Sequence, residues 1–238
     1  MLVRSGVLVE FDLLQVPLAP IVSDMAMSAA LGFRLHTGWA ALVALAREPD
    51  RFKILLRRRI ELLPVGDSVP RFVYHEASKL TASEAVQLVH CAEDASQEAT
   101  RGAVQEVLDH LRGLDFAAQA AGIPSGSRAV PKDLSTVLRS HPMIHSAEGA
   151  LFQQAVIFAC KICGLEVISA HEREVWRSAA AAWNLKETGL RKQIDALRQS
   201  VGAPWGTDQK TAAAFASLAL WPGRRPTTWP KYSPKDGG

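Results

Sequence analysis

The sequence predicts an α/β domain in which helices pack on a mixed sheet of about five strands. Two observations lead to this fold class. Three strand-like segments come first and are followed by a long helix, and later strand-like segments alternate with helices, as in chains with crossover connections. A chain of 238 residues, of which 48% are hydrophobic, is long enough to bury one substantial core.

The first three strands are expected to form an antiparallel meander. Residues 31–36 and the wholly apolar residues 39–46 flank a Thr37-Gly38 pair, which is typical of a tight turn. From residue 52 to residue 63, apolar and charged side chains alternate with a period of two. This alternation predicts a strand with one buried and one solvated face.

A short extended piece over residues 71–75 and then a long helix are expected next. Thr81 and Glu84 form a capping box, in which each side chain satisfies the other residue's backbone amide. This box opens a helix that continues to about residue 112, with mostly small side chains at helical spacing along one stripe. Such a stripe lets a helix lie close against a sheet.

The middle of the chain contains a second strand–helix pair. Residues 114–121 predict a buried strand, residues 122–129 a flexible loop and residues 131–139 a short helix. A break is expected at residues 141–142, where a proline occurs, and the apolar residues 146–163 predict a buried helix. The stripe expected to face the core consists of Ala147, Leu151, Ala155, Phe158 and Ile162.

The remaining elements are one strand and three helices. Gly164 is in the C-cap position of the buried helix, and residues 165–169 predict a short strand. The three helices are expected to be opened by a second capping box over residues 169–172, by Asn184 and by Thr207.

The ordered elements predict a single domain over residues 27–221. In residues 1–26, acids and prolines interrupt short apolar runs, which predicts a poorly ordered N-terminal extension rather than a signal peptide. Residues 222–238 are rich in Pro, Gly, Lys and Arg and predict a disordered basic tail, in which cations such as Arg224 are uncompensated. No apolar run approaches the roughly 20 residues that a membrane span requires.

The composition gives weak constraints on partners and a clearer one on compartment. Lys and Arg number 27 against 24 Asp and Glu, and a net charge of +3 does not by itself indicate a nucleic-acid partner. The three cysteines form no even disulfide framework, which fits a reducing cytoplasm. Cys160 and Cys163 have CxxC spacing at the end of a helix, without a second ligand pair, and are expected to be core thiols.

Two short motifs carry a resemblance to a known family. Residues 34–39 (Arg-Leu-His-Thr-Gly-Trp) read as strand, tight turn and strand, and the last helix opens with Asp208 and a run of alanines after Pro204-Trp205-Gly206. With the order of elements over residues 31–220, these motifs resemble the RuvC-type Holliday-junction resolvases. The resemblance implies the RNase H-like fold, in which a three-stranded antiparallel meander is followed by parallel strands, and a nucleic-acid partner. The His-Thr-Gly-Trp and Ile-His-Ser-Ala-Glu-Gly stretches also resemble a family of uncharacterised bacterial proteins, which adds no expectation about function.

The chain departs from the resolvase pattern at the catalytic positions. The resemblance implies three or four carboxylates that hold two magnesium ions around a phosphate. His36 occupies the first-strand Asp position, and Gln119 is the nearest polar residue to the end of the presumed fourth strand. In the last helix only Asp208 remains, with Thr211 one turn on. The sequence therefore predicts a degenerate RNase H-like domain.

Other polar residues around the start of the apolar helix predict a different pocket, since burying them unpaired is costly. The helix start and the end of the first strand should meet at one edge of the sheet, where ligands of α/β folds gather. The side chains expected to share this pocket, and to be catalytic, are His36, His145, Glu148 and Asp208. With His141, four residues before His145, they are also the candidate metal ligands. Imidazoles with carboxylates suit a divalent transition metal better than magnesium.

Four of the candidates also have an ordinary structural explanation. His36 can cap a strand, and His75, a further candidate, can lie in a surface loop. Glu148 and Asp208 are near helix N-termini, where a carboxylate favours the positive end of the helix dipole. The remaining histidines are at polar helical positions and are expected to be solvated: His90, His110 and His171.

Two functions follow from these observations. The favoured one is a degenerate RNase H-like module that binds nucleic acid or another protein, because the recognisable family chemistry has lost most of its ligands. The alternative is a metal-assisted hydrolase, a phosphoesterase or nuclease, that uses the His/Glu/Asp pocket. Convergence of the candidate side chains in the fold favours the hydrolase, and their dispersal excludes it.

Overall fold

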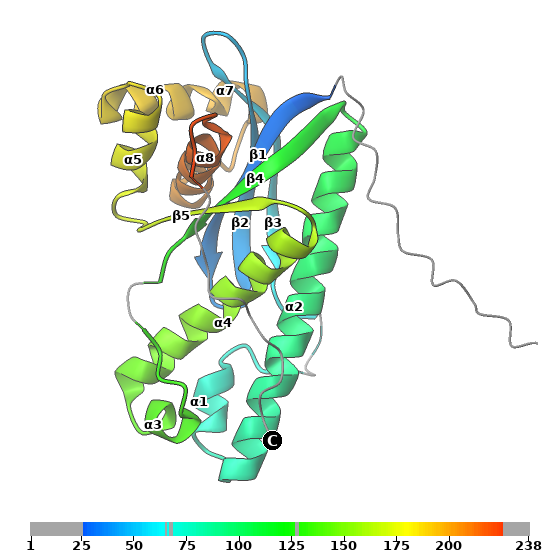
Figure 1. Cartoon of the computed structure of the whole chain (residues 1–238), viewed down its shortest axis with the longest axis vertical. Coiled ribbons are helices and arrows are strands. Elements are labelled where there is room, and N and C mark those ends of the chain that lie inside the picture. Colours follow the sequence, from blue (N-terminus) through cyan, green and yellow to red (C-terminus); the bar gives the residue numbers. More distant parts are fainter. Residues whose placement is uncertain (1–25, 65, 67–68, 127–128, 226–238) are drawn as a thin grey trace, which may run out of the picture.

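A computed structural model describes residues 26–64, 66, 69–126 and 129–225 of the chain (Figure 1). The expected N-terminal extension (residues 1–26) and basic tail (residues 222–238) fall mostly on residues 1–25 and 226–238, which lie outside the described residues. At the start of the expected tail, Arg224 Nε donates a hydrogen bond of 2.9 Å to Glu166 Oε2. Arg224 is therefore compensated, contrary to expectation. No helix in the described part of the chain is long and apolar enough to cross a membrane.

The centre of the fold is a five-stranded mixed sheet with the order β3-β2-β1-β4-β5. The strands are β1 (Met27–His36), β2 (Trp39–Arg47), β3 (Phe52–Glu61), β4 (Phe116–Pro124) and β5 (Glu166–Ala170). Strand β2 is antiparallel to both β1 and β3, whereas β4 runs parallel to β1 and β5 runs parallel to β4. The predicted α/β fold, a three-stranded antiparallel meander followed by parallel strands with helices packed on the sheet, is confirmed.

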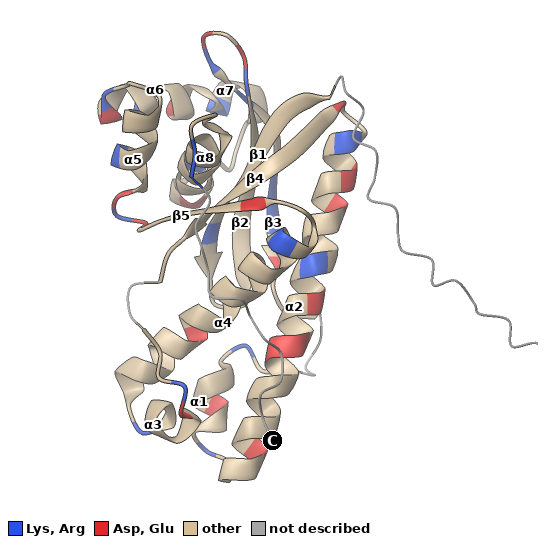
Figure 2. Ribbon diagram, in the orientation of Figure 1, with Lys and Arg blue, Asp and Glu red and all other residues tan. Residues whose placement is uncertain are grey.

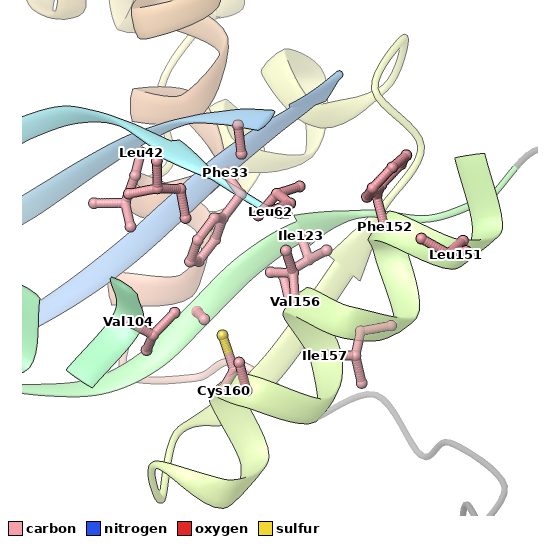
Figure 3. Packing of buried hydrophobic residues seen from close by; sticks show 14 of the residues in the cluster. Phe33, Leu42, Leu62, Val104, Ile123, Leu151, Phe152, Val156, Ile157 and Cys160 are labelled. Carbon is pink, nitrogen blue, oxygen red and sulfur yellow. The ribbon is translucent and has the colours of Figure 1, made fainter. Parts of the chain in front are cut away.

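Helices cover both faces of the sheet (Figure 1). They are α1 (Val73–Ala77), α2 (Ala82–Arg112), α3 (Leu134–Leu138), α4 (His141–Ile162), α5 (Val175–Ala182), α6 (Glu187–Ala196), α7 (Arg198–Val201) and α8 (Thr207–Leu220). Helices α2 and α4 pack on one face, where Phe33 and Leu42 of the sheet meet Val104, Val156 and Cys160 (Figure 3). Helices α5, α6 and α8 pack on the other face. The sheet therefore separates two cores.

Helix α8 lies unusually close to the sheet because two strand residues lack a side chain. A Cβ atom at Gly32 of β1 would stand 2.0 Å from the carbonyl oxygen of Ala212. At Gly122 of β4 it would stand 2.1 Å from that of Phe215. The alanines of α8 complete the fit, and Ala212, Ala213 and Ala216 are fully buried. This contact fixes the start of α8 against the end of β1.

Strand β3 contributes to both cores, which its alternating pattern did not predict. Ile54 pairs with Leu45 of β2 and Leu56 pairs with Ala44, so Leu55 is an extra residue in a bulge. Phe52 and Ile54 belong to the core under α8, whereas Leu56 and Ile60 face the core under α2. The expectation of one buried and one solvated face is therefore wrong.

Two boundaries in the middle of the chain also differ from expectation. Residues 122–124 extend β4 instead of forming a loop, because they pair with β5. Helix α4 begins at His141, so residues 141–142 are no break. Ser140 is its N-cap, and Pro142 is in the first turn, where backbone amides have no partner within the helix and proline loses nothing.

The core-facing stripe predicted for α4 is also wrong, and so are the predicted starts of α5 and α6. Phe158 is half-buried and Ile162 is 61% exposed, whereas Phe152 is buried. Strand β5 runs through Ala170, so there is no capping box over residues 169–172 and α5 begins only at Val175. Asn184 ends α5 with a φ of 53° instead of opening α6.

Candidate functional site

The carboxyl end of β1 meets the start of α8 through a His–Asp pair. His36 Nε2 lies 3.2 Å from Asp208 Oδ1. Arg34, two residues earlier on the same face of β1, also pairs with Asp208, and its Nε donates to Glu172 Oε1 at 3.1 Å. One guanidinium therefore bridges the two carboxylates at this edge of the sheet.

Aromatic stacking fixes the His36 ring. The rings of His36 and Trp39 are nearly parallel, with an interplanar angle of 4° and centroids 4.0 Å apart. The guanidinium carbon of Arg59 lies 4.1 Å from the centroid of the Trp39 ring on the neighbouring strand. The imidazole is thus held between the tight turn and Asp208.

A buried carboxylate on α4 organises the second part of the site. Glu148 Oε1 accepts hydrogen bonds from the backbone amides of Tyr74 at 2.8 Å and His75 at 3.3 Å, and lies 3.2 Å from His75 Nδ1. These amides belong to the first turn of α1, so Glu148 caps a helix distant in the sequence. It lies in the second turn of its own helix, and the expected role at the start of that helix is wrong. Residues 71–75 were expected to be extended, and the cap explains why residues 73–75 are helical instead.

The other oxygen of the Glu148 carboxylate, Oε2, is buried and has no hydrogen-bond partner among the described residues. The side chain as a whole is 4% exposed. Glu148 is the only acid of α4, and Figure 2 shows this helix almost free of charged residues. A buried anion with a free oxygen therefore stands beside the histidines described next.

Three imidazoles converge where α1 meets the start of α4. His75, His141 and His145 each offer a ring nitrogen, and the three nitrogens lie within 4.8 Å of one another. The ring centroids are 4.4 Å apart for His141 and His145, 4.9 Å for His75 and His145, and 5.5 Å for His75 and His141. Helical spacing places His141 and His145 on one face of α4, since the helix includes both. The candidate ligands thus separate into this histidine group, with Glu148 beside it, and the His36–Asp208 pair.

Two neighbouring cavities connect these groups. The smaller, of about 210 Å³, is lined by His36, His145 and Glu148 together with Leu35, Phe72 and Phe152. The larger, of about 610 Å³, lies beyond the ends of β4 and β5. Both have His145 in their walls, so His145 stands between them.

The larger cavity contains polar residues that the sequence did not reveal as a site. Ser125 Oγ lies 3.1 Å from His171 Nδ1, so His171 is not simply solvated. Ser125, not Gln119, is the polar residue at the end of β4. Arg34, Ser125, His171 and Glu172 were missed, although a signal existed. Ser125 and His171 directly follow β4 and β5, Glu172 comes one residue later, and Arg34 shares the strand face of His36.

Comparison with known proteins gives similarity in structure alone. No protein family model and no curated protein matches the chain. The structure of Thermus thermophilus RuvC is 13% identical, with 79% of this chain and 91% of that chain covered and a TM-score of 0.46. T. thermophilus RuvC in complex with a Holliday junction substrate is 14% identical, with coverages of 80% and 90% and a TM-score of 0.46. The chain is thus similar to these two structures over most of its length.

Proposed function

We propose that the chain is a hydrolase of phosphoesters whose reaction takes place at the carboxyl end of β1. One observation carries the proposal: His36, hydrogen-bonded to Asp208, lines the same cavity as His145 and Glu148. An imidazole oriented by a carboxylate and facing a cavity is the usual arrangement of a general base.

The reaction needs a water molecule and a proton acceptor. His36 accepts the proton of the attacking water on the ring nitrogen that is not bonded to Asp208, and Asp208 stabilises the resulting imidazolium. The water oxygen forms a bond to phosphorus, and the bond from phosphorus to the leaving oxygen breaks. Arg34 pairs with Asp208 and orients its carboxylate. The stacked Trp39 restricts rotation of the imidazole.

The larger cavity, which shares Leu35, His145 and Gly149 with the cavity that His36 lines, is the proposed binding site for the phosphoester. Its volume of about 610 Å³ is within the usual range of small-molecule sites, roughly 300–1,000 Å³. Ser125, His171 and Arg173 supply hydrogen-bond donors or positive charge, and Glu172 in the same wall is paired with Arg34. A nucleic acid is one source of such a phosphoester. The cofactor that suits this histidine-rich site is a divalent transition metal rather than magnesium.

A panel of bis(p-nitrophenyl) phosphate, p-nitrophenyl phosphate and a single-stranded oligonucleotide, each with Mg²⁺, Mn²⁺ or Zn²⁺, tests the proposal. We expect turnover of at least one substrate, and a loss of about 100-fold or more in His36→Ala and Asp208→Asn, the range of general-base removal. His110→Ala, on the exposed surface of α2, is the matched control and should retain full activity. Absence of turnover under all nine conditions, or full activity in His36→Ala, contradicts the proposal.

A second candidate, the degenerate binding module, is favoured by the pairing of Arg34 with both Asp208 and Glu172. A guanidinium bonded to both acids competes with cations for them, so the site would keep affinity for a phosphate backbone or another protein without cutting it. This candidate predicts oligonucleotide binding that weakens steeply with salt, in a protein inactive throughout the panel. Two results contradict this candidate: oligonucleotide binding that does not weaken as salt is added, and turnover of any substrate in the panel.

A further inference from the structure

We propose that His75, His141 and His145 form a binding site for one divalent transition-metal ion, with Glu148 as the carboxylate that orients His75. The proposal goes beyond the hydrolase function, because the site would bind metal even if the chain hydrolysed nothing. It also assigns the ligands differently from the sequence, with His75 in the group and His36 and Asp208 outside it.

The nitrogens are almost at coordination distance. In a tetrahedral site with zinc–nitrogen bonds of about 2.1 Å, ligand nitrogens lie about 3.4 Å apart. The three nitrogens here are within 4.8 Å of one another, so each pair has to close by at most about 1.4 Å. His141 and His145 are exposed, and rotation of their side chains provides this movement without a change in the backbone.

The contact with Glu148 fixes which His75 nitrogen faces the ion. His75 Nδ1 lies 3.2 Å from Glu148 Oε1, and since a carboxylate oxygen accepts, Nδ1 is the donor and Nε2 would be the ligand atom. A carboxylate behind a metal-binding histidine is the usual outer-shell partner, because it orients the ring and raises the ligand's basicity.

The charge of Glu148 offsets the two helix N-termini near the ion. The starts of α1 and α4 both carry partial positive charge, which opposes a cation. One Glu148 oxygen is already bonded to α1, whereas the buried Oε2 lacks any partner in the described part of the chain. A divalent ion beside this carboxylate would compensate the buried charge.

The ligand set selects the class of ion. Three imidazoles with no thiolate suit zinc, cobalt, nickel or copper, whereas magnesium and calcium prefer oxygen ligands. Three protein ligands also leave a fourth position for water, as in catalytic zinc sites. His145 lines both cavities, so this position is accessible to small molecules.

Isothermal titration of the chelator-treated full chain with Zn²⁺ tests the site, and the visible spectrum of the Co²⁺ form reports its geometry. We expect one Zn²⁺ per chain and a tetrahedral Co²⁺ spectrum. His141→Ala should weaken Zn²⁺ binding by 100-fold or more and abolish this spectrum. The His141 side chain is exposed, so this substitution should leave folding intact. Glu148→Gln keeps an acceptor for the α1 amides and should weaken binding roughly 10- to 100-fold, as outer-shell changes do.

His110→Ala and His36→Ala are the controls, and both should bind Zn²⁺ as the wild type does. Zn²⁺ binding in an inactive wild type contradicts the hydrolase and leaves the metal site intact, so the two proposals fail separately. Wild-type affinity in His141→Ala, equal competition by Mg²⁺, or loss of binding in His36→Ala overturns the assignment.

Discussion

At the scale of single residues, Glu148 connects the fold to the candidate site. Its carboxylate holds two amides of α1 and the ring of His75, although it comes from a helix more than 60 residues later in the chain. The same group therefore stabilises a helix and positions a candidate ligand. Any substitution there has to be interpreted for both roles.

Glu148→Ala leaves two α1 amides without their acceptor in a buried setting, and such losses cost about 1–3 kcal/mol each when the group cannot reach water. We expect the free energy of unfolding in urea to fall by about 2–4 kcal/mol. Glu148→Gln keeps the acceptor oxygen and should lose less than half as much. Equal losses in the two variants would show that charge, not capping, is what α1 requires.

Glu93 on α2 predicts a pH dependence of stability. Burial raises the pKa of its carboxyl above the ordinary 4.5, Asp94 adds to the rise, and His90 opposes it. Because the folded pKa is the higher one, the stability contributed by protonated Glu93 is complete below pH 4.5 and is lost as the pH rises through the folded pKa. Glu93→Gln should therefore raise Tm at pH 7 and leave it nearly unchanged at pH 4. A Tm gain that is the same at both pH values would contradict this account.

At the scale of elements, α4 presents a different face to the core from the one its sequence indicated. Phe152 is 1% exposed and packs between α4 and the sheet (Figure 3), whereas Phe158 is half-buried. Phe152→Ala should cost about 3–5 kcal/mol of unfolding free energy, the usual range for a buried phenylalanine. Phe158→Ala, measured in the same urea titration, should cost less than half of that. A larger loss of unfolding free energy in Phe158→Ala than in Phe152→Ala would contradict this packing and support the stripe predicted from the sequence.

Replacement of glycine by alanine should have opposite effects at Gly32, where α8 packs closely on the sheet, and at Gly102, where there is free space. Gly32→Ala forces a methyl group against backbone atoms of α8 that cannot rotate away, and should cost about 1–3 kcal/mol or more. Gly102→Ala, in α2 with no atom within 4 Å of its added Cβ, should stabilise the chain by roughly 0.5–1 kcal/mol. Thermal unfolding of the two variants should therefore shift Tm in opposite directions. Equal shifts would mean that α8 can move off β1 at little cost.

The sequence predicted correctly those elements whose stabilising contacts are between residues close together in the chain. The Thr81–Glu84 capping box opens α2 as expected, because both partners lie within one turn. The similar pattern over residues 169–172 failed, because pairing with β4 kept the chain extended through Ala170. Helix α1 could not be predicted, since its cap is Glu148, and for the same reason nothing in the sequence placed His75 beside His145.

At the scale of the whole molecule, the parallel arrangement of β1, β4 and β5 brings both candidate groups to one end of the sheet. That His36 and His145 line one cavity follows from strand direction, which the order of elements indicated. The pairing of Arg34 with two acids depends on side-chain geometry across β1, α8 and the turn after β5, and has no trace in the sequence. The sequence therefore predicts where polar groups meet better than which of them bond.

The bulge in β3 gives the two cores an unusual tolerance to the loss of one residue. Deleting Leu55 would leave Ile54 opposite Leu45 and Leu56 opposite Ala44, with every other side chain of β3 still on its present face. Deleting Arg59 instead would turn Ile60 away from the core under α2, since a shift of one residue exchanges the faces of a strand. We expect the first deletion to give a folded protein with a lower Tm and the second to give little or no cooperative unfolding in circular dichroism. If both deletions prevent folding, the sheet edge at β3 needs its bulge and not only its register.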